Sequence, residues 1–200
     1  LLLKNISDSY RSFNNLCLGQ IVLLEKGEDA EELEELVLKG VKRNTGLDVN
    51  IIRNIYNTWI QNILVKDIAI FPSVSDEVRN SILPFDKGNL GIREEDKFPK
   101  YLIEILKSNG INKNQIEEMR RNFVLLLTDV NKDSHVSHNN RYLLSSNLML
   151  KTNENGKWYR CNRCSGTSTF TLFDSCIYCG SKDYLSEMSQ KDLERYDFWR

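Results

Sequence analysis

The sequence predicts an α+β protein with a mainly helical N-terminal part, a winged-helix-like module and a C-terminal four-cysteine zinc ribbon. Three observations support this fold class. Apolar residues recur at helical spacing through most of the first two thirds of the chain, short apolar runs between turn residues follow, and two Cys-x-x-Cys pairs lie near the C-terminus. We expect five regions: helical residues 1–83, a linker or loop at 84–96, the winged-helix-like module at 97–150, the zinc ribbon at 151–185 and a C-terminal helix at 186–200.

The N-terminal region has three stretches with apolar residues at helical spacing, namely residues 8–26, 30–42 and 48–64. The second stretch has acidic residues in its first turn and basic residues in its last turn, which suits the helix dipole. A short fourth helix is expected over residues 75–83. A proline, two glycines and several charges at residues 84–96 then predict a linker or a long surface loop.

The winged-helix-like module is predicted from the order of its elements. Helical periodicity covers residues 98–107 and 113–127, and Asn112 is placed to cap the second of these helices. Residues 141–144 and 147–151 have the composition of strands and lie close enough to form a hairpin. Helix, turn, helix and hairpin is the order found in winged-helix domains.

The four C-terminal cysteines carry the strongest chemical signal. They form two pairs, Cys161 with Cys164 and Cys176 with Cys179, separated by eleven residues. Two such pairs place four thiolates around one tetrahedral ion, with Zn–S bonds of about 2.3 Å. Because sulfur fills every position and none stays open for water, we expect one structural Zn²⁺ per chain. Iron in a rubredoxin-like site is the alternative metal, and a redox pair is the alternative chemistry.

The segments before the cysteine pairs support a ribbon. Residues 157–160 and 169–173 have the composition of strands, and each leads into a Cys-x-x-Cys knuckle. The fifth cysteine, Cys17, lies between two leucines and is expected to be a small core residue. His135 and His138 form a second metal candidate, but a solvated polar loop is the preferred interpretation because the cysteines already saturate one zinc.

Composition limits the partners and the cell compartment. The chain has 200 residues, with 27 basic and 28 acidic side chains and a net charge of −1, so any nucleic-acid surface must be local. No run approaches the roughly 20 apolar residues of a membrane span, and no signal peptide is recognisable. Four cysteines in metal spacing favour a reducing cytoplasm over disulfides. Because the chain does not begin with methionine, we expect a segment of a longer protein.

A nucleic-acid surface is predicted from basic residues on the second winged-module helix and around the first knuckle. Tyr159 and Tyr178 add aromatic rings that can contact bases. Ordinary solvated charge is the alternative, and Glu117 and Glu118 on the same helix support it. No nucleotide-binding loop, nucleophile elbow or zinc-protease motif occurs in the chain. The predicted nucleic-acid-binding residues are Lys113, Arg120, Arg121, Arg160 and Arg163.

Residues 141–200 resemble the C-terminal region of bacterial DEAD/DEAH-box helicases of superfamily 2, including anti-phage defence helicases. The matching segments are Tyr142-Leu-Leu, Asn147-Leu-Met-Leu, Trp158-Tyr-Arg-Cys161-x-x-Cys164, Cys176-x-x-Cys179-Gly and Arg195-Tyr-Asp-Phe-Trp-Arg200. The resemblance implies a winged-helix-like segment leading to a four-cysteine zinc module, with DNA or RNA, a helicase motor domain or other defence-system subunits as partners. The motor motifs are absent here, so ATP-dependent activity would belong to another part of the parent protein.

These observations predict a non-catalytic accessory segment of a nucleic-acid-acting protein, whose zinc ribbon guides nucleic acid or braces a helicase motor. The alternative is a zinc-ribbon platform that docks another protein without binding nucleic acid directly. A third possibility is an enzyme whose site matches no known motif.

Overall fold

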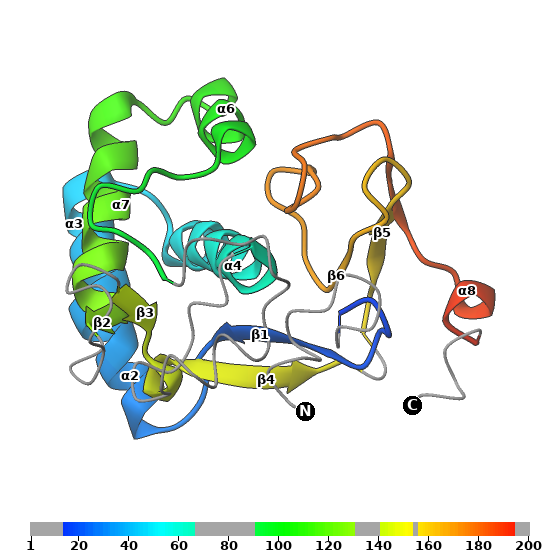
Figure 1. The fold of residues 1–200 in the computed structure, drawn as a ribbon, viewed down its shortest axis with the longest axis horizontal. Helices are drawn as coiled ribbons and strands as arrows, with labels where there is room; N and C mark the ends of the chain where they lie inside the picture. The colour runs from blue at the N-terminus through cyan, green and yellow to red at the C-terminus, as the bar shows by residue number, and fades with distance from the viewer. Residues whose placement is uncertain (1–13, 67–90, 131–140, 154–155, 195–200) are drawn as a thin grey trace.

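The computed structural model describes residues 14–66, 91–130, 141–153 and 156–194 (Figure 1). Helices and short antiparallel sheets alternate along the chain, so the α+β class is confirmed. The helical elements are α2 (Glu28–Leu33), η1 (Glu34–Leu38), α3 (Lys39–Thr45), α4 (Val49–Lys66), α6 (Lys100–Ser108), α7 (Lys113–Leu127), η2 (Ser145–Asn147) and α8 (Gln190–Glu194). The strands are β1 (Gly19–Leu23), β2 (Thr128–Val130), β3 (Arg141–Leu143), β4 (Leu148–Thr152), β5 (Tyr159–Cys161), β6 (Thr167–Ser168) and β7 (Leu185–Glu187).

Four of the predicted helical stretches are confirmed. The stretch at 30–42 is a continuous helical segment, α2–η1–α3, which ends at Gly46 with a left-handed φ of 73°. The stretch at 48–64 is α4, and the stretches at 98–107 and 113–127 are α6 and α7. Asn112 caps α7 through a capping box, since its side chain accepts from the Asn114 and Gln115 backbone amides while the Gln115 side chain accepts from the Asn112 amide.

The helix predicted at 8–26 is wrong where the structure describes it, because residues 19–23 form strand β1. This strand pairs antiparallel with β4, with Gly19 opposite Thr152. Its other edge faces α4, where Asn57 accepts from the Leu23 amide at 2.8 Å and Gln61 donates to the Ile21 carbonyl. These two buried side chains, four residues apart, satisfy backbone groups that would otherwise form an open sheet edge.

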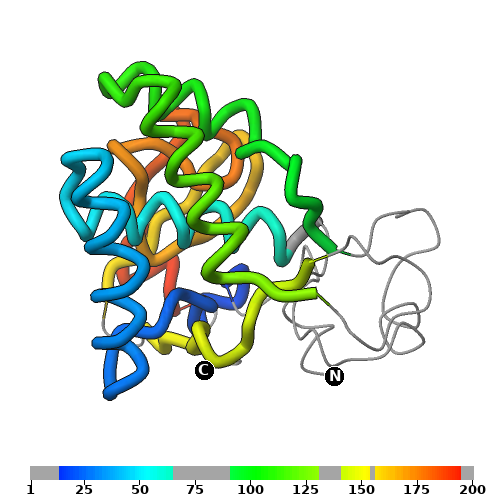
Figure 2. The backbone as a smooth tube through the Cα atoms, turned by 90° about the vertical axis from the view of Figure 1, so that its left-hand side faces the viewer, coloured from blue at the N-terminus to red at the C-terminus, as the bar shows by residue number. Residues whose placement is uncertain are grey.

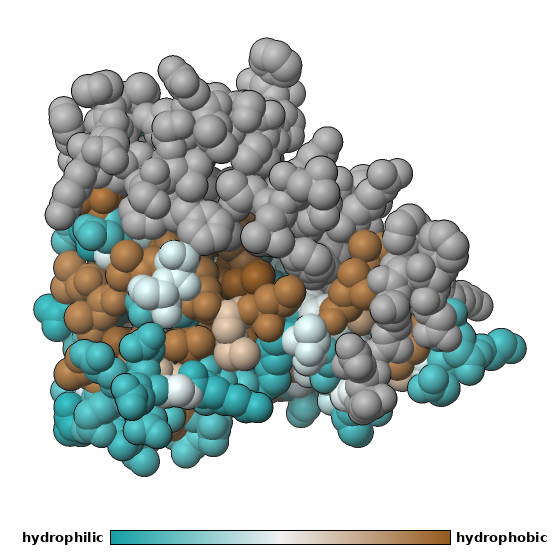
Figure 3. All heavy atoms as spheres, turned by 90° about the horizontal axis from the view of Figure 1, so that it is seen from below, coloured by the Kyte–Doolittle hydropathy of each residue, from teal (hydrophilic) through white to brown (hydrophobic). Residues whose placement is uncertain are grey.

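The hairpin predicted between residues 141–144 and 147–151 is also wrong, although both segments contain strands. β3 pairs with β2, which directly follows α7, and β4 pairs with β1. The 3₁₀ turn η2 separates β3 from β4 and directs the two strands into different sheets. Seen from below, apolar side chains gather beside hydrophilic ones on one face of the molecule (Figure 3); Leu150 of β4 is among the exposed apolar residues.

A single large cluster of buried side chains joins the helices to the cysteine-bearing residues 156–194, which we call the cysteine module. Trp59 of α4 is its aromatic centre, with ring centroids 4.6 Å from Phe98 and 4.2 Å from Phe123. Leu172 and Ile177 of the cysteine module belong to the same cluster. The module therefore packs against α4 and α6 (Figures 1 and 2).

Several predicted features lie outside the described residues. They are the short helix at 75–83, most of the linker at 84–96, the histidine pair His135 and His138, and the aromatic end of the C-terminal helix. Within the described ranges, no helix combines the length and the apolar character that crossing a membrane requires.

Replacing Gly19 with alanine tests the β1–β4 pairing. A Cβ at this position would lie 2.8 Å from the Lys151 carbonyl oxygen, which is backbone and cannot rotate away. We expect Gly19→Ala to lower the free energy of unfolding by about 1–3 kcal/mol in urea denaturation. Gly40→Ala in α3 is the matched control, because its nearest atom is an arginine side-chain nitrogen at 4.0 Å. Alanine favours helix, so this control should raise stability by up to about 1 kcal/mol, and equal losses in both variants would contradict the pairing.

Candidate metal centre

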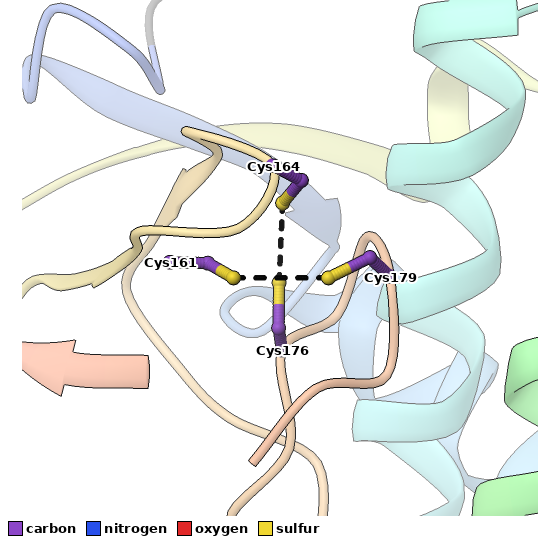
Figure 4. Close-up of side chains that lie close together, drawn as sticks. All are labelled: Cys161, Cys164, Cys176 and Cys179. Carbon is purple, nitrogen blue, oxygen red and sulfur yellow. Dashed lines mark hydrogen bonds between the residues drawn. The ribbon is translucent and has the colours of Figure 1, made fainter. Parts of the chain in front are cut away.

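The four cysteine side chains converge on one point of the cysteine module (Figure 4). Their sulfur atoms all lie within 4.8 Å of one another, with Sγ–Sγ distances of 3.7 Å for Cys161–Cys179 and 3.6 Å for Cys164–Cys176. A tetrahedral ion with bonds of about 2.3 Å requires sulfurs about 3.8 Å apart, whereas a disulfide requires about 2.05 Å. The sulfur positions therefore fit one shared metal ion, and no other such group of ligands occurs in the described parts of the chain.

The first knuckle follows β5 and places Cys161 and Cys164. The Cys161 carbonyl accepts from the Ser165 amide at 2.8 Å, and the Cys161 amide donates to the Gly166 carbonyl at 3.0 Å. Ser165 has a φ of 60°, the left-handed conformation that reverses the chain after the second sulfur. Strand β5 holds this knuckle at the centre of the three-stranded sheet, between β6 and β7.

The second knuckle repeats this backbone pattern. The Cys176 carbonyl accepts from the Gly180 amide at 2.9 Å, and the Cys176 amide donates to the Ser181 carbonyl at 2.9 Å. Gly180 has a φ of 75° and occupies the same position in its knuckle as Ser165 in the first. The Tyr178 amide also points at the Cys176 sulfur, with an N–Sγ distance of 3.5 Å. Two equivalent loops thus present two sulfurs each.

The strand predicted at 169–173 is wrong, because β6 lies earlier and a tight turn takes its place. Leu172 and Ser175 exchange both backbone hydrogen bonds, and the two residues between them, Phe173 and Asp174, have φ values of 50° and 58°. Positive φ at both central positions is typical of the turns that join paired strands. Cys176 follows this turn directly in the chain.

Tyrosine hydroxyls tie the second knuckle to the rest of the protein. The Tyr101 hydroxyl of α6 donates to the Ile177 carbonyl at 2.6 Å and accepts from the Asn62 side chain of α4 at 2.6 Å. The Tyr178 hydroxyl donates to the Thr167 carbonyl at 3.0 Å and accepts from the Asn14 side chain at 2.8 Å. Nothing local in the sequence distinguishes Tyr101, Asn62 and Asn14 from ordinary helix or loop residues, so their role at the metal centre was not predicted.

Gly180 fits against α6 at close range. A Cβ there would lie 3.3 Å from the Tyr101 Cβ and 3.5 Å from the Ile105 Cδ1.

The fifth cysteine, Cys17, is buried away from the four-cysteine cluster. Its sulfur lies 4.0 Å from the Met188 sulfur in a small core that includes Trp158 and Leu193. The prediction that Cys17 is a core residue is confirmed.

Proton sharing shapes the charge of the cluster before a metal binds. The hydrogen bond between the Cys164 and Cys176 sulfurs lowers the pKa of Cys164 to about 5. The same pairing, together with burial, raises the pKa of Cys176. Burial likewise raises the pKa of Cys179. A metal ion that binds all four thiolates must therefore displace protons at neutral pH.

The structure separates the predicted nucleic-acid-binding residues into two groups on opposite sides of α4 (Figure 1). Lys113, Arg120 and Arg121 lie on α7, where Arg120 pairs with Glu117 at 2.6 Å and Arg121 pairs with Glu118 at 2.8 Å. Arg160 lies on β5, and Arg163 is exposed in the first knuckle. The five residues do not form one surface.

Comparison of the chain with protein-family models, curated proteins and solved structures finds no match. The resemblance to helicase C-terminal regions therefore stays a prediction.

Alanine at Cys176 tests the shared metal site. We expect Cys176→Ala to abolish stoichiometric metal binding, since three thiolates and an open position hold zinc far less well, and to lower the thermal midpoint of the whole chain because Ile177 belongs to the main core. Elemental analysis and circular dichroism give the two readouts. Cys17→Ala is the matched control and should keep one metal per chain. Equal metal content in both variants would contradict the site.

Acidification should release the metal. Cys176 and Cys179 have raised pKa values, so protons compete with the metal increasingly as the pH falls. We expect the metal affinity, measured by competition with a chromophoric chelator, to drop by more than tenfold between about pH 8 and pH 6. An affinity that is independent of pH would show that the thiols do not bind as thiolates.

Proposed function

We propose that this chain is a non-catalytic accessory segment of a nucleic-acid-acting protein, in which one structural Zn²⁺ holds a zinc ribbon that guides a DNA or RNA strand or braces a helicase motor domain. The convergence of Cys161, Cys164, Cys176 and Cys179 carries this proposal. Zinc and iron both suit four thiolates, and zinc is preferred because it is inert to redox change in a purely structural site. The three-stranded sheet with two equivalent knuckles supports a ribbon.

The accessory role follows from the closed ligand set. Four sulfurs leave no coordination position for water or substrate. The ion would therefore stabilise the local fold and would take no part in a reaction. Hydrogen bonds from Tyr101 and Tyr178 would transmit that rigidity to α4, α6 and the N-terminal segment. A ribbon held in this way offers a fixed edge against which a strand or a motor domain can be positioned.

A winged-helix-like module remains part of the proposal, with a changed strand pair. Helices α6 and α7 are followed by the antiparallel pair β2–β3, which would take the place of the hairpin expected further along the chain. The reducing cytoplasm is the proposed compartment, because the site needs four reduced thiols.

Protein docking without nucleic acid is the second candidate, and a specific surface favours it. The arginines of α7 are already paired with glutamates, and the outer side of α2 and η1 is acidic. Leu36 projects from this acidic side with 62% of its surface exposed. Such a surface repels nucleic acid and suits a basic protein partner.

Strand binding by the whole chain at two salt concentrations separates the candidates. With one zinc per chain verified on the same sample, we expect labelled single strands to bind, and the affinity to fall at least several-fold when the salt is raised from about 50 to 200 mM. Zinc-loaded protein that binds neither DNA nor RNA would overturn the strand-guiding role and favour docking to a protein, either a motor domain or another partner.

A further inference from the structure

Two loops of the cysteine module lie side by side on its surface. The Asn162 amide of the first knuckle donates to the Tyr184 carbonyl at 2.8 Å, and the Leu185 amide donates to the Lys182 carbonyl at 3.1 Å to close a turn. Residues 162–165 and 182–184 are exposed. We call Asn162, Arg163, Lys182 and Tyr184 of these loops the knuckle lip.

Tyr184 has the properties of a stacking platform. Its side chain is 54% exposed, and it is the one exposed aromatic residue in the described parts of the chain. The hydroxyls of Tyr56, Tyr101 and Tyr178 each donate to a backbone carbonyl and hold the fold together. Within the described ranges the Tyr184 hydroxyl forms no such hydrogen bond, and an exposed ring of this kind can stack on an unpaired base.

The cations of the knuckle lip are available to phosphate. Arg163 and Lys182 form no ion pair with any carboxylate of the described residues, whereas Arg120 and Arg121 of α7 are held by glutamates on their own helix. A phosphate that approached α7 would have to break those pairs first. A phosphate that approached the knuckle lip would find exposed hydrogen-bond donors, including the Asn162 side chain.

We infer that the knuckle lip binds single-stranded nucleic acid, with a base stacked on Tyr184 and the flanking phosphates held by Arg163 and Lys182. The inference rests on the proposed function and places its contact surface on the cysteine module instead of on α7. Single strands are the expected ligand because stacking on one protruding ring needs an unpaired base, and the lip is a pair of turns and not a helix that could enter a groove.

Asp183 opposes this binding from within the same turn. Its carboxylate is exposed between Lys182 and Tyr184, and it repels phosphate. Removing its charge should therefore tighten binding, while removing either cation should weaken it. Opposite responses at neighbouring positions give a signature that loss of fold cannot imitate.

The test is fluorescence anisotropy with a labelled oligothymidylate of about 15 nucleotides, within the range that such surfaces cover, and a duplex of equal length. All variants are made in the whole zinc-loaded chain, and zinc content is verified in each. We expect Tyr184→Ala to weaken single-strand binding about tenfold and Tyr184→Phe to retain it. Arg163→Gln and Lys182→Gln should each lower the salt slope by about 0.7, and Asp183→Asn should tighten binding. Lys42→Gln, on the distant helix α3, is the charge control and should leave binding unchanged.

The outcomes separate this inference from the proposed function. Single-strand binding that Tyr184→Ala leaves unchanged, while paired substitution of Arg120 and Arg121 weakens it, would overturn the knuckle lip and keep the accessory role. Duplex binding as tight as single-strand binding would overturn the stacking geometry. Absence of binding to either probe would overturn the knuckle lip as a binding surface for DNA, together with the DNA-guiding role of the proposed function.

Discussion

The requirement that four sulfurs meet at one point is the constraint on which the C-terminal part of the fold depends. The strands of its sheet are only two or three residues long, and sheets of that size are marginal in water without another source of stability. The equivalent hydrogen bonds of the two knuckles bring Cys161 and Cys176 into matching positions. A shared ion would turn these positions into a single rigid unit.

Polar contacts then join that unit to the helical part. Tyr101 links α6, α4 and the second knuckle, and Tyr178 links the knuckle to Asn14. Gln20 accepts from both the amide and the hydroxyl of Thr169, which joins β1 to the module as well. These bonds connect segments far apart in the sequence. Changes at the metal centre should therefore lower the stability of the helices as well as that of the loops that hold the cysteines.

Charge pairing decides which surfaces are open to an anionic partner. The net charge near zero leaves no general attraction, so the local arrangement matters. On α7 the arginines are occupied by neighbouring glutamates, and the outer side of α2 is acidic. Among the described residues, Arg163 and Lys182 of the knuckle lip form no ion pair with a carboxylate, which is why the proposed nucleic-acid contact lies on the cysteine module.

Local sequence patterns alone were enough to predict much of the secondary structure and the cysteine site of this protein. The cysteine spacing predicted the shared site, the helical periodicity predicted α4, α6 and α7, and Asn112 predicted a cap, because each signal lies within a few residues. Only the tertiary structure decided that residues 19–23 form a strand, that β3 pairs with β2, and that Tyr101 supports the knuckle. The short apolar run at residues 21–24 suits helix or strand equally, and the composition of a strand does not predict which strand it pairs with, so long-range packing made these choices.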